Sequence, residues 1–351
     1  MQPLSGIVVI DFTTLLPGPL ATLMLARAGA DVIKIEPPGG EAMRFYPPYA
    51  GGQSAAFAML NAGKTCREID LKSTAGCDEV IGMLRCADVL VEQFRPGVMT
   101  RLGLDFASVR AINPRLIFCS ISGYGQSGPR SQEAGHDLNY IGNTGLLALA
   151  PGVAAPTVPP VLVADIAGGS FPAVMNILLA LRQRDITGEG CHLDIAMSDT
   201  MFTFAWHALA SSVEGPLPGP SEGLLAGGSP RYHLYQTGDG GLIACAALEQ
   251  KFWLAFCGVI GLAAPLANDF ANPIATRDAV AAIIATKTAD EWRPVFVAAD
   301  CCVTVVVSLE EALRDPHFIG RGLFSQREGA VVPDLPLPID AAFRAKPATK
   351  N

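Results

Sequence analysis

Three short runs decide the fold of this chain: Ile7-Val-Val-Ile-Asp11, Leu15-Leu-Pro-Gly-Pro19 and Asp31-Val-Ile-Lys-Ile-Glu36. The first and third runs predict buried strands. The segment from Pro19 to Ala28 between them predicts an apolar helix with proline near its first turn. Strand, helix and strand in this order form a β-α-β unit. An acid ends the second strand, but Pro-Gly-Pro stands where a Gly-x-Gly-x-x-Gly turn would be needed, so we reject a dinucleotide site.

Further apolar runs extend this unit into a sheet. We expect short strands at 69–72, 87–91, 116–121 and 191–197, and helices at 74–85, at 169–182 and from the last strand to about 213. Strands that alternate with helices imply a parallel sheet with both faces covered. The sequence therefore predicts an α/β large domain over residues 1–213.

A second, smaller domain follows a linker rich in proline and glycine that begins at Glu214. Residues 232–246 predict a β-hairpin that turns at Gly238–Gly241. Two helices are expected at 250–260 and 276–298. We thus place a linker and a small α+β domain at 214–305, and a C-terminal segment that returns to the large domain at 306–351.

Composition excludes several classes of partner and site. The net charge of 25 − 33 = −8 argues against nucleic acid or a membrane surface as a partner, and we expect no apolar run to reach membrane-spanning length. We expect no leader segment, because residues 1–6 show neither a basic n-region nor an apolar h-region. Nine cysteines without Cys-x-x-Cys spacing indicate reduced thiols and a cytoplasmic protein, and five histidines without a His-x-x-x-His pair argue against a metal site.

One segment carries groups suited to proton transfer. In Ala134-Gly-His136-Asp137-Leu-Asn-Tyr140, a histidine and a carboxylate follow a glycine-rich loop and open a helical run. Asp165 precedes another helical run, 165 − 136 = 29 positions later. Helix N-termini stabilise negative charge, so the pattern indicates acid/base chemistry on a substrate that becomes an anion. The alternative is that these residues serve only as helix caps.

Basic residues gather around two loops, with Lys64, Arg67 and Lys72 in one and Arg95 and Arg101 beside Phe94 in the other. An aromatic ring next to several cations suits a nucleotide with phosphates, because the ring stacks on the base and the cations neutralise charge. The alternative is a solvated face with one half-buried phenylalanine.

A series of motifs in fixed order resembles the family III CoA-transferases. The similarity runs from about residue 4 to residue 325, and its motifs are Leu4–Asp11, Leu16–Pro19, Asp70–Lys72, Val89–Met99, Ser122–Gly128 and Asp315–His317. Within the family, the segment from Ala134 to Tyr140 most resembles the α-methylacyl-CoA racemases, since transferases usually carry an aromatic residue where His136 stands. The resemblance implies a Rossmann-like large domain, a small domain and an interlocked homodimer.

The resemblance also implies roles for individual residues. His136 and Asp165 match the two racemase bases, and Glu249 matches an acid that the small domain brings to the histidine. The residues expected to contact the CoA thioester or its nucleotide end are Ile69, Asp70, Leu71, Lys72, Phe94, Arg95, Arg101, Gly135, Leu138, Asn139 and Tyr140. Family members commonly have arginine after the acid that ends the second strand. Here Pro37 stands there, so a phosphate contact is either missing or supplied by another residue such as Arg44.

The chemistry of such a reaction agrees with these residue types. Removing a proton next to a thioester makes an enolate, which needs a base on each face and hydrogen-bond donors for the oxygen. Histidine, with an ordinary pKa of about 6.5, accepts a proton near neutrality. Asp165 must be protonated when it donates, which requires a raised pKa. Backbone N–H groups near Asp137 could hold the oxygen.

We therefore expect a racemase or epimerase acting on 2-methylacyl-CoA thioesters, with no metal, nicotinamide or flavin, since CoA is part of the substrate. Two alternatives stay open. In a CoA-transferase, Asp137 would attack a thioester and pass through an anhydride and an enzyme thioester. In a CoA-ligand-binding protein, catalysis would be lost. The sequence leaves the identity of the acyl group open.

Overall fold

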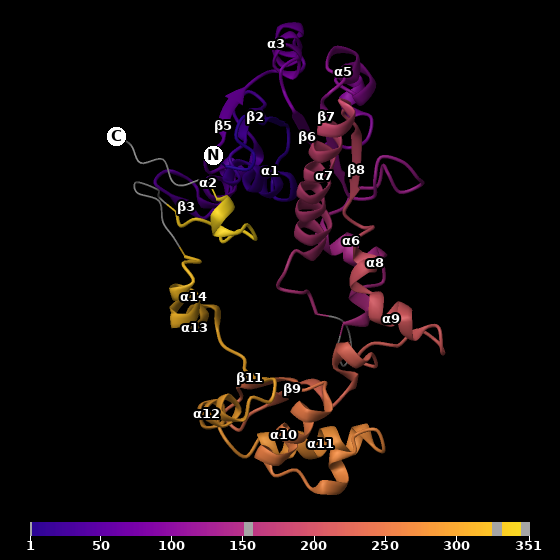
Figure 1. Cartoon of the computed structure of the whole chain (residues 1–351), viewed down its shortest axis with the longest axis vertical. Helices are drawn as coiled ribbons and strands as arrows, with labels where there is room; N and C mark the ends of the chain where they lie inside the picture. Colours follow the sequence, from indigo (N-terminus) through magenta and orange to yellow (C-terminus); the bar gives the residue numbers. More distant parts are fainter. Residues whose placement is uncertain (1, 151–156, 325–331, 345–351) are drawn as a thin grey trace. The chain divides into compact units, whose positions relative to one another are not determined.

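The computed structural model describes residues 2–150, 157–324 and 332–344 (Figure 1). The chain divides into two compact units. The large unit comprises residues 1–144, 159–203 and 319–351, and the small unit comprises 145–158 and 204–318. The division thus falls at 204 and 319, compared with the expected 214 and 306, and it assigns 145–158 to the small unit.

The large unit is built on a six-stranded sheet in the order β5-β2-β1-β6-β7-β8, and every pair of neighbouring strands is parallel. The strands are β1 Val8–Asp11, β2 Asp31–Glu36, β5 Thr65–Glu68, β6 Val89–Glu92, β7 Ile117–Ser122 and β8 His192–Ala196. This confirms the predicted α/β class and its parallel sheet. All-parallel sheets need helices on both faces, because their strands are apolar on both sides.

One predicted strand was wrong. Residues 69–72 form a turn, and the strand β5 lies just before them. The backbone N–H of Lys72 donates to Oδ1 of Asp70 at 2.9 Å, and the N–H of Ser73 donates to the Asp70 carbonyl at 3.0 Å. Aspartate commonly closes a turn through its own side chain in this way, so the chain bends here towards the next helix.

Helices cover the two faces of the sheet. Ile10, Leu90 and Phe118 share one buried cluster with residues of α3 and α5, while α1 and α7 contact each other and the strands. Side chains alternate between faces along a strand, so the two helix pairs pack on opposite faces. The helices of this unit are α1 Pro17–Arg27, α2 Ala55–Leu60, α3 Thr74–Leu84, α4 Val98–Arg101, α5 Phe106–Ile112, α6 Asp137–Asn143, α7 Phe171–Thr187 and α8 Met201–Phe204. Short elements complete it: the 3-10 turns Ala42–Phe45 and Ala341–Phe343, the π-helical turn η3 Ala164–Ser170, and the strand pair β3 Tyr49–Ala50 and β4 Gln53–Ser54.

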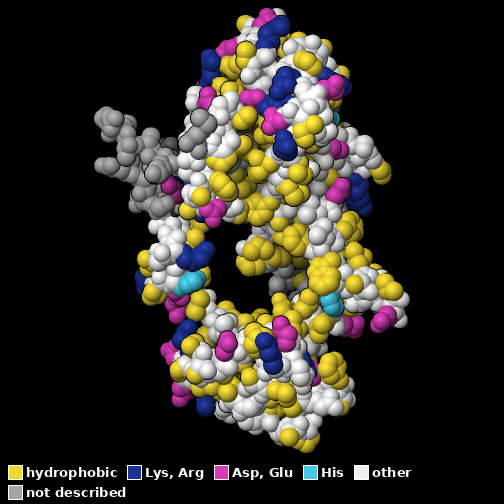
Figure 2. Space-filling model, viewed as in Figure 1, with side chains coloured by type: hydrophobic (Ala, Val, Ile, Leu, Met, Phe, Trp, Pro, Cys, Tyr) yellow, Lys and Arg dark blue, Asp and Glu magenta, His cyan; other side chains and the backbone are white. Residues whose placement is uncertain are grey.

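The helical run from Ala164 to Thr187 is longer and more apolar than expected. The run has 24 residues, and an 18-residue window within it has a mean hydropathy of 1.5, so it is long and apolar enough to cross a membrane by length and composition, and the expectation that no such run exists was wrong. Ala173, Ile177 and Ala180 on this helix are buried, and it contacts α1, β7 and β8. Those contacts are typical of a core helix. Met175 and Leu179 are more than half exposed, and Figure 2 shows apolar side chains gathered where α7 lies.

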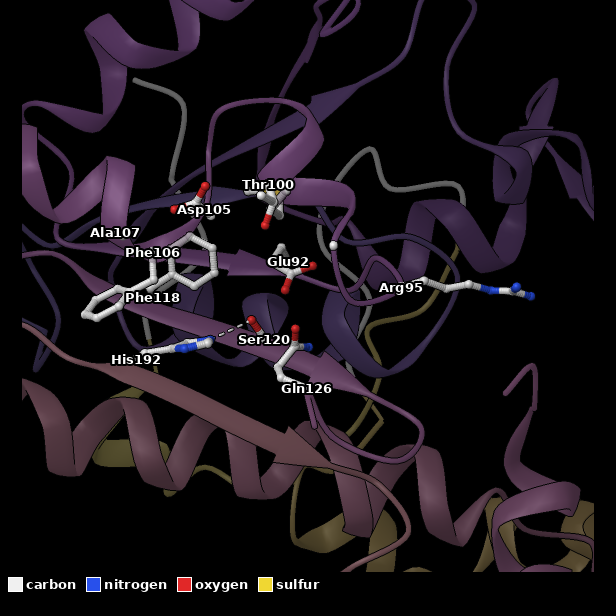
Figure 3. Close-up of a pocket in the computed structure, with 12 residues that line it drawn as sticks. Glu92, Arg95, Thr100, Asp105, Phe106, Ala107, Phe118, Ser120, Gln126 and His192 are labelled. Carbon is white, nitrogen blue, oxygen red and sulfur yellow. Dashed lines mark hydrogen bonds between the residues drawn. The ribbon is translucent and has the colours of Figure 1, made fainter. Parts of the chain in front are cut away.

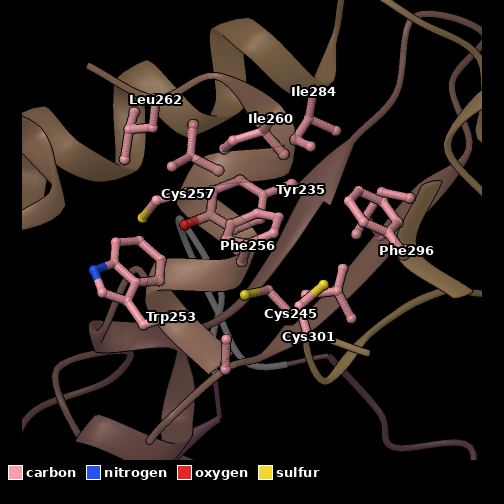
Figure 4. Close-up of a cluster of buried hydrophobic side chains, with 14 of the residues drawn as sticks. Tyr235, Cys245, Trp253, Phe256, Cys257, Ile260, Leu262, Ile284, Phe296 and Cys301 are labelled. Carbon is pink, nitrogen blue, oxygen red and sulfur yellow. The ribbon is translucent and has the colours of Figure 1, made fainter. Parts of the chain in front are cut away.

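The small unit holds an antiparallel sheet in the order β11-β10-β9. The predicted hairpin is confirmed as β9 Tyr232–Gln236 and β10 Leu242–Ala246, and β11 Val303–Val305 pairs with β10. Its core contains Tyr235, Trp253, Phe256, Trp292 and Phe296, most of which Figure 4 labels. Its helices are α9 Trp206–Ser211, α10 Gln250–Ile260, α11 Pro273–Ile284, α12 Ala289–Ala299 and α13 Leu309–Arg314, followed by α14 Pro316–Gly320 at the boundary. Two further turns are Leu224–Gly228 and Ala264–Ala267.

The single helix expected at 276–298 was wrong, because two helices occupy this region. The helix α11 ends at Ile284, and Thr288 begins α12 with a capping box. The Thr288 hydroxyl accepts from the backbone N–H of Glu291 at 3.2 Å, and the Glu291 carboxylate accepts from the N–H of Thr288 at 2.8 Å. Such a reciprocal cap satisfies backbone donors at a helix start. The helix expected up to 213 is likewise interrupted, between α8 and α9.

Candidate active site

A cavity of about 410 Å³ opens in the large unit where the parallel strands end. Its walls come from the segments after β1 and β6, from the end of β7, and from the start of α6. The carboxyl ends of parallel strands meet at one edge of the sheet, which is where α/β proteins commonly bind ligands. The lining residues that matter for the predictions are Phe94, Arg95, Gly135, His136, Asn139, Tyr140 and Asp165.

His136 occupies the N-cap position of α6, but its ring is not used as a cap. The backbone N–H of His136 donates to Oδ1 of Asn139 at 3.0 Å, and no side-chain cap bond holds the imidazole. The side chain is exposed at the wall of the cavity. The helix start therefore orients this residue through its backbone and leaves the ring available to exchange a proton with a bound molecule.

Asp137 lies directly behind the histidine and is buried, with 4% of its surface exposed. Its Oδ1 accepts a hydrogen bond of 2.9 Å from the backbone N–H of Asp165. The carboxylate thus joins the start of α6 to the start of η3. This bond brings Asp165 to the same cavity as His136.

Asp165 lies in the first turn of η3 and is partly buried. Burial raises the pKa of its carboxyl to about 6; the charge of Asp137 adds to the rise and His136 opposes it. Ionisation of a buried carboxyl is disfavoured because the charged form loses its hydration, and a neighbouring carboxylate repels it further. Asp165 therefore changes protonation state near neutral pH, as a group that both donates and accepts protons must.

A network of buried charges supports the loop after β1, and sequence reasoning missed it. Thr13 N–H donates to Oδ1 of Asp11 at 2.8 Å, and Nζ of Lys64 lies 3.2 Å from Oδ2 of Asp11. Burial opposes ionisation of Asp11, but Lys64 and Lys34 outweigh it and hold the pKa below its usual range. Burial lowers the pKa of Lys64 to about 8. The sequence signal that could have revealed this network is Asp11, a charged residue at the end of the otherwise apolar strand β1.

The same network positions Leu15, which lines the cavity. The backbone N–H of Leu15 donates to Oε2 of Glu41 at 3.0 Å, and Oε1 of Glu41 lies 3.1 Å from Nζ of Lys34. Leu15 has φ = 60°, a left-handed conformation that costs free energy in a residue with a branched side chain. The buried ion pair offsets that cost and holds the wall of the cavity in place.

Some of the residues predicted to contact CoA are open to a ligand, and others are buried in the core. Phe94 and Arg95 line the cavity, and Lys72 and Arg101 are exposed. Ile69 is 5% exposed and belongs to the core cluster that contains Ile10, Leu90 and Phe118, and Leu71 packs against that cluster. The side chain of Ile69 therefore serves the core, and its backbone N–H donates to the Glu36 carbonyl at 2.8 Å.

Asp70 closes the turn described above, and Leu138 is 44% exposed on α6. The Tyr140 hydroxyl donates to the carbonyl of Gly135 and braces the segment before the helix. Arg44 donates to both oxygens of Glu36 at 2.6 Å, and its guanidinium lies 3.9 Å above the Phe57 ring. Glu36 therefore holds the side chain of Arg44, the residue suggested as a replacement phosphate contact.

Glu249 belongs to the small unit, where it is exposed at the N-cap position of α10 and its side chain makes no cap bond. The cavity lining of the large unit includes His136 and Asp165 but not Glu249. Within residues 2–150, 157–324 and 332–344, no three histidine, cysteine or acidic side chains cluster as metal ligands would.

Comparison with known proteins identifies the family. The profile of CoA-transferase family III matches residues 4–347. The chain belongs to this family. It is 35% identical to an acetyl-CoA:oxalate CoA-transferase of Acetobacter aceti, over 96% of this chain and 89% of that protein. It is 32% identical to the human α-methylacyl-CoA racemase, over 99% of this chain and 89% of the racemase.

Solved structures support the same assignment. The crystal structure of a CAIB/BAIF family protein from Brucella suis superposes with a TM-score of 0.80 at 30% identity, and the match covers 97% of this chain and 92% of that one. The family of CoA-transferases and racemases thus includes this enzyme, and both reactions occur among its relatives.

Proposed function

We propose that the protein is a racemase or epimerase that inverts the α-carbon of 2-methylacyl-CoA thioesters. The observation that carries this proposal is that two different bases, His136 and Asp165, line one cavity. Burial raises the pKa of Asp165 to about 6, so this carboxyl can both release and take up a proton near neutral pH. A reaction that takes a proton from one face of a carbon and returns one to the other face needs such a pair.

In this mechanism His136 removes the α-proton of one enantiomer, and the electrons of the C–H bond move to the thioester oxygen to form an enolate. Protonated Asp165 then delivers its proton to the opposite face of the α-carbon, and the enolate returns to a thioester. For the other enantiomer, Asp165 is the base and the imidazolium of His136 is the acid. Backbone N–H groups at the start of α6, near Asp137, stabilise the enolate oxygen.

Other residues bind the substrate and complete the enzyme. Phe94, Arg95, Lys72 and Arg101 hold the nucleotide and phosphates of CoA, and the thioester lies along the start of α6. Glu249 of the small domain assists the histidine in an interlocked homodimer, as the family resemblance implies. CoA is part of the substrate, and we propose no further cofactor.

A CoA-transferase is the second candidate, and the 35% identity to an oxalate CoA-transferase favours it. Its mechanism needs the carboxylate of Asp137 as a nucleophile. That side chain is 4% exposed, and one of its oxygens accepts a hydrogen bond from Asp165. This buried side chain is not among the residues that line the cavity, whereas His136 and Asp165 are, so the geometry supports proton transfer better.

Solvent exchange separates the two reactions. The protein is incubated in D2O with one enantiomer of a 2-methylacyl-CoA, and NMR and chiral analysis follow the α-position. We expect deuterium at the α-carbon together with the opposite enantiomer. Transfer of CoA to an added free acid, with hydroxylamine-sensitive labelling of Asp137 and no deuterium uptake, would replace this proposal with the transferase. Binding of CoA thioesters without either reaction would leave only a ligand-binding protein.

A further inference from the structure

A second cavity, of about 430 Å³, lies in the large unit beside β6, β7 and β8 (Figure 3). We call it the Glu92 cavity. Arg95 borders both this cavity and the candidate active site, and in Figure 3 its side chain extends away from the Glu92 cavity. The residues that decide its chemistry are Glu92, Phe106, Phe118, Ser120, Gln126 and His192.

Polar side chains from three neighbouring strands meet on the floor of the Glu92 cavity. Nε2 of His192 lies 3.0 Å from the hydroxyl of Ser120, and Ser120 is paired in register with Glu92 on the adjacent strand. Partial burial lowers the pKa of His192, so this ring is neutral at pH 7 and supplies no positive charge. The backbone N–H of Phe94 also donates to Oε2 of Glu92, at 2.8 Å.

Glu92 differs from most other buried acids of this protein in having no cationic partner. Asp11 pairs with Lys64, Glu36 with Arg44, Glu41 with Lys34, and Asp269 with Arg231. Buried Asp137 lacks a cation too, but it lies at a helix N-terminus. Among the side chains that the structure describes, no cation lies within 4.0 Å of the Glu92 carboxylate, although only 3% of this residue is exposed.

The charged groups around Glu92 are the acids Asp105 and Asp194 and the cations Arg95 and Arg110, neither of which pairs with its carboxylate. Burial raises the pKa of Glu92 to about 7; the charge of Asp194, which belongs to β8, contributes to this rise, and Ser120 and the Phe94 N–H oppose it. Asp105 also lines the cavity at the start of α5. A carboxyl group in this position would gain from a bound positive charge, because ionisation in a low-dielectric site is costly without one.

Aromatic rings form the wall above this floor. The rings of Phe106 and His192 stack with centroids 5.3 Å apart, and the edge of His192 meets Phe118 at 5.2 Å. Aromatic faces attract cations and exclude water, which favours an organic cation over a hydrated metal ion. Nε2 of Gln126, which also lines the cavity, is buried without a hydrogen-bond partner in the described chain.

We propose that the Glu92 cavity binds a small protonated amine with an aromatic or apolar body. The ammonium group donates to the Glu92 carboxylate, and the body packs against Phe106 and Phe118. The negative charges of Glu92, Asp105 and Asp194 exclude the phosphates of CoA from this site. The amine site is therefore separate from the candidate active site, and it does not depend on which reaction that site performs.

Calorimetric titration of the full-length protein tests this proposal with benzylamine and its neutral counterpart, benzyl alcohol. We expect benzylamine to bind at least about tenfold more tightly, because only the ammonium pairs with Glu92. Binding at pH 7 should release about half a proton, since the amine ionises a carboxyl that is about half protonated. Titration in two buffers of different ionisation enthalpy measures this release. Equal affinity for the two ligands would overturn the proposal.

Two variants test which cavity binds benzylamine. Glu92→Gln keeps an acceptor for the Phe94 N–H and should weaken benzylamine at least about tenfold. Glu133→Gln removes an acid from the lining of the candidate active site and should leave benzylamine binding unchanged. The reverse pattern would assign the amine to the other cavity and overturn the proposal.

The unmodified protein provides a test that does not depend on the folding of a variant. Benzylamine affinity should rise about tenfold from pH 6 to pH 8, as Glu92 with its pKa of about 7 becomes ionised. The other charged or titratable groups that face the site are His192, Asp105, Asp194, Arg95 and Arg110, the last of which lies 6.0 Å from the centre of the Phe106 ring. An affinity that does not change with pH would contradict a role for Glu92.

Discussion

The backbone N–H of Asp165 donates a 2.9 Å hydrogen bond to Oδ1 of Asp137. The two residues lie 28 positions apart in the chain, and this bond joins the starts of two helical segments. The same carboxylate that orients Asp165 also raises its pKa. Geometry and proton affinity at this site therefore depend on one contact.

The first prediction concerns the two proposed bases. His136→Ala and Asp165→Ala should each lower racemisation at least about 10²-fold, the usual loss when a general base is removed. Each variant should still exchange the α-hydrogen of one enantiomer with solvent, while inversion is lost in both directions. Chiral analysis and deuterium NMR measure the two reactions separately. Loss of exchange for both enantiomers in both variants would contradict separate roles on the two faces.

The second prediction uses Asp137→Asn. Asparagine keeps an oxygen that accepts from the Asp165 N–H, so activity should stay within about tenfold of the parent protein, as expected when only one charge is lost. Removing the negative neighbour should lower the pKa of Asp165 from about 6. For the enantiomer on which Asp165 must start ionised, kcat/KM rises with pH through this pKa. The variant should therefore reach its plateau at a lower pH.

A pH–rate profile of kcat/KM for each enantiomer measures that shift. A midpoint that stays in place or moves to higher pH would show that Asp137 does not tune Asp165. Complete loss of activity in Asp137→Asn, with most activity retained in His136→Ala, would instead point to the CoA-transferase.

The third prediction concerns CoA binding. Lys72→Ala and Arg101→Ala should raise KM for every acyl-CoA with little change in kcat, because the nucleotide is bound equally in the ground and transition states. Arg110→Ala is the matched control, since Arg110 is an exposed cation of α5 that faces Glu189 at 3.5 Å. Its KM should equal that of the parent. An unchanged KM in the first two variants would place those side chains outside the site.

The fourth prediction compares a buried ion pair with an exposed one. Lys64→Met leaves Asp11 buried and short of a partner, so the free energy of unfolding should fall by about 3–5 kcal/mol. Arg67→Met breaks the pair with Glu79, in which both side chains are about half exposed, and should cost less than about 1 kcal/mol. Urea denaturation measures both. Similar losses of unfolding free energy in the two variants would show that the buried Asp11–Lys64 pair contributes little to stability.

The fifth prediction concerns assembly. We propose an interlocked homodimer, as the family resemblance implies, and its subunits should stay together on dilution because separation would require unfolding. Exposed apolar side chains on α7, such as Met175 and Leu179, are surfaces that a second copy could bury. Light scattering and mass photometry at nanomolar concentration measure the mass. A folded monomer under these conditions would rule the interlocked form out.

The sequence by itself determined the elements that depend on local pattern. The strands β1 and β2, the hairpin β9–β10 and the helix that begins after His136 were predicted from apolar periodicity, turn residues and caps, which act over a few positions. The family was likewise recognised from short motifs in fixed order. The strand β5 was misplaced because all four of its residues are exposed at the edge of the sheet, so it carries no apolar signal.

Only the tertiary structure decided which polar groups meet. Three groups of residues distant in the chain come together only in the fold: Asp11 with Lys64, Asp137 with Asp165, and Glu92 with Ser120 and His192, the last group on neighbouring parallel strands. Burial, which raises the pKa values of Asp165 and Glu92, is likewise a property of the packed fold. The physical reason is that hydration and charge at a side chain depend on its neighbours in space, and a linear pattern of residues does not specify those neighbours.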